Sequence, residues 1–208
     1  MRIRYHRALP CAIAGMAACL FGQPTPTPST KFGGHVIGET VQQWLDITHL
    51  NVAEICGPHK RNDKAMDYKT VCANLSSFLH GESGKFFTTD DAHRNIEWRF
   101  DNSKVSEARM LDDLSLSSAE EHISFLKALY GEPINTHLVK HQNLMGGTWE
   151  TIEAKWEMPD GASIIGMEVM GFQTDPMFRA FQVIVSSRER LELNARESAN
   201  KPNPYAPR

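Results

Sequence analysis

Apolar residues recur at two spacings along this chain, and the spacing changes near residue 84. Where they fall three or four positions apart we expect helices, because such positions share one face of an α-helix. Helical spacing is found in 39–50, 66–79 and 116–130. Where apolar residues alternate, or form short runs between turn residues, we expect strands. Such stretches are 32–38, 84–89, 95–100, 104–111, 148–156, 163–170 and 178–187.

Capping residues predict where the helices begin and end. Thr40 can cap the first helix, and Ser117 or Ser118 can cap the third, with Glu121 in its first turn. Gly131 then ends this third helix. The residues expected to face inward from it are Ile123, Leu126, Leu129 and Tyr130.

Together these elements predict an α+β fold, an antiparallel β-meander packed on about three helices, in one domain over 32–193. A faint internal echo links 96–105 with 152–164, since both hold an alternating strand, a polar turn and a second strand. The echo suggests two tandem helix-plus-hairpin halves, 32–113 and 114–193. Hairpins of this kind are also generic, so duplication and coincidence both stay open.

The two ends of the chain have a different character. Residues 1–22 combine three arginines with a short apolar segment, which is typical of a bacterial-type export signal. The segment is shorter than the roughly 20 apolar residues that span a bilayer. Residues 23–31 form a Pro/Thr linker. Residues 194–208 hold too little apolar matter to pack, so we expect a loose, flexible tail there. We therefore expect an exported protein, either periplasmic or secreted.

Cysteine placement fits export. Cys56 and Cys72 are the cysteines that follow the leader, and in an oxidising compartment they are expected to form a disulfide; the alternative is two free thiols. Cys19 follows small residues as in a lipoprotein processing site, although Met16 stands where such sites more often have leucine. Lipidation at Cys19 would give an outer-membrane lipoprotein attached only through its N-terminus. Ordinary cleavage near Gly22 is the alternative.

Composition and charge narrow the classes of function. Of the 208 residues, 41% are hydrophobic and 23% charged, which is ordinary for a folded globular domain. Loss of Arg2, Arg4 and Arg7 with the leader takes the formal net charge from −3 to about −6. This charge argues against nucleic acid as a partner, because phosphate binding needs a concentrated basic face.

Three short motifs carry a resemblance. Phe-Gly-Gly-His-Val-Ile-Gly-Glu precedes the first helix at 32–39, Leu-Tyr-Gly-Glu-Pro closes a helix at 129–133, and Trp-Glu-Met-Pro-Asp-Gly turns a hairpin at 156–161. Over about 32–190 the chain resembles exported α+β proteins of the β-lactamase-inhibitor-protein fold and the BamE family of outer-membrane assembly lipoproteins. It departs from them by the charged, cysteine-flanked segment 56–72. The resemblance implies a protein-binding or envelope-associated role in place of a reaction.

Motifs for catalysis or metal binding are absent from the sequence. His137 and His141 are four apart, but their segment is not convincingly helical, and neither HExxH nor CxxC occurs. No Gly-x-Ser-x-Gly elbow is found, and adjacent acids such as Asp112-Asp113 are typical of solvated charges. Leu-Met-Gly-Gly at 144–147 lacks the Lys-Ser/Thr of a phosphate loop. We therefore assign no catalytic, cofactor-binding or metal-ligating residue, and no cofactor.

Large aromatic residues on the predicted strands have two interpretations. They pack in the core, which is their usual place, or they form an exposed strip that binds a partner. The residues are Trp98, Phe100, Trp149 and Trp156.

The favoured hypothesis is an exported, non-catalytic binding or envelope-associated protein, with another envelope or secreted protein as its partner. An exported hydrolase-like enzyme with a dispersed site is the alternative. The sequence does not give the oligomeric state.

Overall fold

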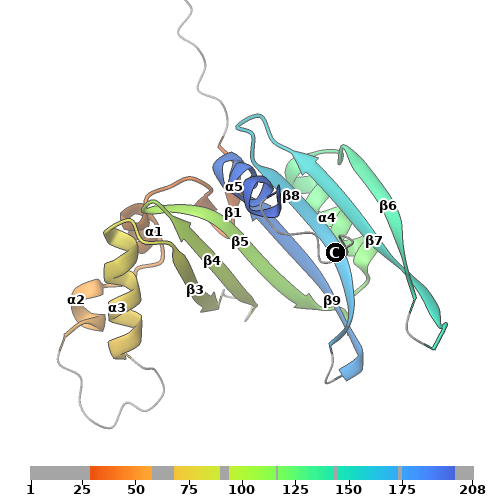
Figure 1. Ribbon diagram of the computed structural model, residues 1–208, viewed down its shortest axis with the longest axis horizontal. Coiled ribbons are helices and arrows are strands. Elements are labelled where there is room, and N and C mark those ends of the chain that lie inside the picture. Colours follow the sequence, from red (N-terminus) through yellow and green to blue (C-terminus); the bar gives the residue numbers. More distant parts are fainter. Residues whose placement is uncertain are drawn as a thin grey trace, which may run out of the picture.

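A computed structural model describes residues 29–57, 68–89, 94–115, 117–142, 145–172 and 175–199 (Figure 1). The fold is α+β, as predicted, with helices packed against an antiparallel sheet. The predicted leader, Cys19 and the end of the predicted tail lie outside the described residues. Within the described part, no helix is long and apolar enough to cross a membrane.

Five helices and nine strands are assigned in the described residues. The helices are α1 (Val41–Ile47), α2 (Val52–Ile55), α3 (Tyr68–Leu79), α4 (Ala119–Tyr130) and α5 (Arg188–Ala199). The strands are β1 (Lys31–Phe32), β2 (His35–Val36), β3 (Gly84–Thr89), β4 (Asn95–Asp101), β5 (Lys104–Asp113), β6 (Asn135–Gln142), β7 (Thr148–Glu157), β8 (Ser163–Phe172) and β9 (Asp175–Ser186). β1 and β2 form a small hairpin of their own.

The other seven strands form one antiparallel sheet in the order β3-β4-β5-β9-β8-β7-β6. The chain builds a first meander, crosses through α4, and builds a second meander that runs inward from the far edge (Figure 1). The last strand, β9, lies in the middle and pairs with β5 on one side and β8 on the other. The two hairpins that carry the sequence echo, β4–β5 and β7–β8, therefore lie on opposite sides of β9.

One face of this sheet holds the core. A row of successive register partners crosses five adjacent strands, and each of its members is at most 1% exposed. The row consists of Trp98, Ala108, Val185, Ile164 and Trp156. Directly paired residues of antiparallel strands point to the same face, so the row belongs to a single hydrophobic layer.

Helices from both ends of the sheet cover this layer. Trp44 of α1 packs edge-on against Phe100, and Phe78 of α3 stacks on the same ring. On the other side of β9, Leu126 of α4 lies above Gly166, where an added Cβ would come within 2.8 Å of its Cδ1. The opposite face carries α5, whose Arg190 Nη1 lies 3.6 Å from Asp101 Oδ2.

Capping explains why the predicted helices begin where they do. Thr40 and Gln43 form a capping box at α1, and Ser118 and Glu121 form one at α4. Gly131 ends α4 with a φ of 83°, which a residue with a side chain rarely adopts. The predicted caps at Thr40 and Ser118 are confirmed.

The predicted disulfide is also confirmed. Cys56 and Cys72 are joined with an S–S distance of 2.09 Å and a Cα–Cα distance of 5.2 Å, linking the end of α2 to α3. A covalent loop of this length stabilises a fold by about 3 kcal/mol in the chain-entropy model.

Three predictions from the sequence are wrong. β6 was not expected as a strand, and α5 continues to Ala199 although residues from Asn194 were expected to be loose. Leu129 was expected to face inward, but its side chain is 56% exposed. β6 is an edge strand with little burial on either face, so its sequence shows no alternation. α5 is held by charged pairs such as Arg188–Glu192 and by the buried Arg190, which an apolar pattern cannot reveal.

Candidate functional site

The predicted aromatic residues do not form an exposed binding strip. Trp98, Phe100 and Trp156 are at most 1% exposed and belong to the core layer. Trp149 is half-buried near the β6–β7 turn, where its ring stacks on His141 with centroids 5.3 Å apart. The exposed-strip interpretation is therefore wrong for three of the four residues, and core packing describes them.

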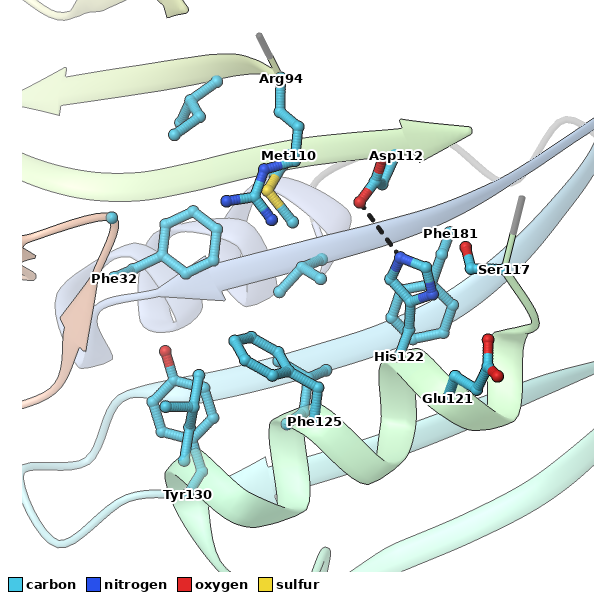
Figure 2. A pocket seen from close by; sticks show the side chains of 15 residues that line it. Phe32, Arg94, Met110, Asp112, Ser117, Glu121, His122, Phe125, Tyr130 and Phe181 are labelled. Carbon is cyan, nitrogen blue, oxygen red and sulfur yellow. Dashed lines mark hydrogen bonds and ion pairs between the residues drawn. The ribbon is translucent and has the colours of Figure 1, made fainter. Parts of the chain in front are cut away.

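A groove of about 420 Å³ lies beside α4, above the centre of the sheet (Figure 2). Its size falls within the range of small-molecule pockets. Both halves of the chain contribute to it. The apolar residues that line it are Phe32, Ile96, Met110, Phe125, Leu126, Leu129, Phe181 and Val183.

Packing under α4 explains why this space is open. Gly166 of β8 has no side chain, so Leu126 and Phe181 occupy the place where its Cβ would be, within 2.8 and 2.9 Å of that position. α4 is thus seated over β8, to one side of the β1–β2 hairpin. Phe125 and Leu129, one turn apart, are left on the groove side with 59% and 56% of their surface exposed.

Two large exposed apolar side chains on the wall of one hollow form a surface that an apolar ligand can cover.

Polar groups gather at one end of the groove, around His122. Its Nε2 lies 3.1 Å from Asp112 Oδ2 (Figure 2). Its Nδ1 lies 3.0 Å from the carbonyl oxygen of Ser118. The ring also packs on Phe181, with centroids 4.9 Å apart. Both ring nitrogens therefore face oxygen acceptors.

This pairing does not suit acid–base catalysis. A histidine that activates a serine directs one nitrogen at the serine hydroxyl, whereas the two nitrogens of His122 lie against the carbonyl oxygen of Ser118 and the carboxylate of Asp112. Ser117 also lines the groove, but within the described residues it makes no hydrogen bond to His122. The cluster of Ser117, His122, Asp112 and Glu121 therefore lacks the connections of a catalytic triad.

Tyr130 lies at the other end of the groove (Figure 2). Its hydroxyl donates a 2.7 Å hydrogen bond to the carbonyl oxygen of Lys31, which ties the end of α4 to β1. Burial raises the pKa of Tyr130 above the ordinary value of 10.0. The hydroxyl therefore keeps its proton at neutral pH and can continue to donate.

His137 and His141, which are four residues apart in the sequence, both lie on β6 and have separate partners. His137 lies 4.0 Å from Glu153, and His141 shares a 2.7 Å hydrogen bond with Thr151. Among the residues that the structure describes, no three His, Cys, Asp or Glu side chains come close enough to hold a metal ion.

Sequence reasoning missed the groove residues, and one signal could have revealed them. Apolar residues of α4 occur at Ile123, Phe125, Leu126, Leu129 and Tyr130, which is a wider arc than contact with one sheet requires. The excess lies at Phe125 and Leu129. Arg94 precedes β4, Asp112 is on β5 and His122 is on α4, so no local pattern joins them.

Comparisons with protein-family models, with curated proteins and with solved structures found no match to this chain. The resemblance to β-lactamase-inhibitor and BamE-like proteins therefore stays a prediction.

Proposed function

We propose that this protein is a non-catalytic binding protein that holds a small apolar or amphipathic molecule in the groove beside α4. The observation that carries the proposal is the exposure of Phe125 and Leu129 on the wall of a hollow of about 420 Å³. Covering two such side chains would be favourable by the hydrophobic effect, about 25 cal/mol for each Å² removed from water.

We propose that the protein is exported and binds its ligand in the periplasm or outside the cell. The disulfide between Cys56 and Cys72 supports this setting, because such bonds persist in oxidising compartments. Attachment to the outer membrane through a lipid on Cys19 is the alternative. Mass spectrometry of the N-terminus of the protein isolated from its own cells tests cleavage and lipidation together. A chain with an intact N-terminus found in cytosol would contradict export.

Binding can be tested with an uncharged fluorophore such as N-phenylnaphthylamine, which brightens in apolar sites. We expect saturable binding with one molecule per chain, and loss of that binding in Phe125→Glu, because a carboxylate would stand in the apolar wall. Leu138→Glu is the matched control, since Leu138 on β6 is also 59% exposed but does not line the groove. Equal binding by both variants, or no saturation with the natural sequence, would refute the proposal.

A hydrolase is the second candidate, because Ser117, His122, Asp112 and Glu121 do meet at one end of the groove. The occupied nitrogens of His122 argue against it. Hydrolysis of p-nitrophenyl butyrate by the natural protein and by His122→Ala distinguishes the two. We expect no turnover above background in either protein. Turnover that depends on His122 would favour the enzyme.

A further inference from the structure

We infer that the ligand of the groove is a single-chain amphiphile with a carboxylate head, and that Arg94 binds the head. This inference rests on the proposed function and adds the chemical class of the ligand. A volume of about 420 Å³ lies toward the lower end of the range for ligand pockets, so one aliphatic chain suits it better than a two-chain lipid.

Along α4, the residues that line the groove divide into an apolar part and a polar part. Phe32, Phe125 and Tyr130 lie toward one end, and Asp112 and His122 lie toward the other (Figure 2). The side chain of Arg94 enters from the start of β4 and reaches the lining beside Met110, between these two parts (Figure 2). A chain lying along Phe125 and Leu129 would thus bring its head to the guanidinium.

The carboxylates of the lining already have donors. Asp112 Oδ2 faces His122 Nε2 at 3.1 Å, and Glu121 Oε2 accepts from the backbone N–H of Ser118 at 2.9 Å. A carboxylate can accept several hydrogen bonds, so these donors weaken its attraction for a cationic head without excluding one. His122 in turn has both nitrogens engaged, so it offers no further donor to an anion.

Arg94 is different, because its guanidinium carries five N–H groups. Arg94 already takes part in an interaction, and with five N–H groups it can still donate to a ligand. Its planar fork matches the two oxygens of a carboxylate, and such charge-assisted pairs are the stronger hydrogen bonds. When an aliphatic chain fills the groove it removes water from the guanidinium, and an anionic head would compensate for that loss.

The test compares decanoate, decanol and decylamine, which share one chain and differ in the charge of the head. Each is used below its micelle concentration to displace N-phenylnaphthylamine at neutral pH. We expect decanoate to bind about tenfold more tightly than decanol, and decylamine to bind no better than decanol. Added salt should weaken the binding of decanoate and leave that of decanol unchanged.

Arg94→Gln should weaken decanoate about tenfold, to the level of decanol, without changing decanol. Arg94→Lys keeps the charge without the fork and should fall between. Arg188→Gln on α5 is the matched control, because it removes the same charge from an exposed arginine outside the groove lining. Circular dichroism checks the fold of each variant.

The outcomes separate the two proposals. Binding of all three amphiphiles with equal affinity, tighter binding of decylamine, or unchanged decanoate binding in both Arg94 variants would overturn the carboxylate inference while groove binding stands. Failure of all three to bind would overturn the proposed function itself.

Discussion

Trp98 and Trp149 show how strongly the surroundings decide what one kind of side chain does. Trp98 contacts Phe32, His35 and Trp44, and its Nε1 donates to the hydroxyl of Thr88 at 2.8 Å. Trp149 lies half-buried near the end of the β6–β7 hairpin. Both occur on strands with alternating sequence, so periodicity alone could not separate them.

Their substitution by alanine should give very different losses of stability. Trp98→Ala leaves a large cavity in the core and should lower the free energy of unfolding by about 3–5 kcal/mol. Trp149→Ala should cost less than about 1 kcal/mol, because it removes a partly exposed ring. Urea denaturation followed by circular dichroism measures both. Similar losses in the two variants would contradict the placement of Trp98 in the core.

The absence of a side chain at Gly166 lets α4 pack close to β8, and adding a single methyl group there should disturb this packing. Gly166→Ala would bring a Cβ within 2.8 Å of Leu126 and 2.9 Å of Phe181, so these side chains must move. We expect a loss of about 1–3 kcal/mol in the free energy of unfolding. Because Leu126 and Phe181 also line the groove, the affinity for N-phenylnaphthylamine should change as well. A variant with unchanged stability and affinity would show that α4 is not seated in this way.

Among the elements, those with strong local signals could be predicted from sequence. The helices α1 and α4 combine apolar periodicity with capping boxes, and β4 alternates cleanly. The edge strand β6 and the charged helix α5 lack these signals, because little of either is buried. The wide apolar arc of α4 could have indicated Phe125 and Leu129, but not where the groove lies, since its position depends on how α4 packs over Gly166.

The contact between α4 and β1 gives a test based on pH. Tyr130→Phe removes the hydrogen bond to Lys31 and should cost about 1 kcal/mol at neutral pH. Burial raises the pKa of Tyr130, so the neutral phenol is favoured more in the folded than in the unfolded chain. This contribution is complete below about pH 10 and is lost as pH rises through the higher folded value.

The difference in stability between the natural protein and Tyr130→Phe should therefore shrink in alkaline buffer. Urea midpoints of both proteins, taken at neutral and at increasingly alkaline pH, measure this difference. Other groups titrate in both proteins and cancel in the comparison. A difference that stays constant with pH would contradict a role for the phenol proton.

At the scale of the whole molecule, β9 decides whether the two halves can be separate units. It comes last in the chain, yet it lies between β5 of the first half and β8 of the second. Val185 of β9 continues the row of core residues from Ala108 to Ile164. The first half therefore completes its sheet only with a strand from the second.

This arrangement predicts a single cooperative unfolding transition. Trp44 and Trp98 report on the first half, and Trp149 and Trp156 on the second, so a variant with either pair changed to phenylalanine reports on one half alone. In each variant, the urea transition followed by tryptophan fluorescence should coincide with the transition followed by circular dichroism, because loss of β9 exposes core on both sides. Midpoints that separate within one variant would mean that each half is stable without the other. The groove between them would then lie at the junction of two domains. In that case a bound ligand should bring the two urea midpoints closer to each other, because a ligand held by both halves stabilises both.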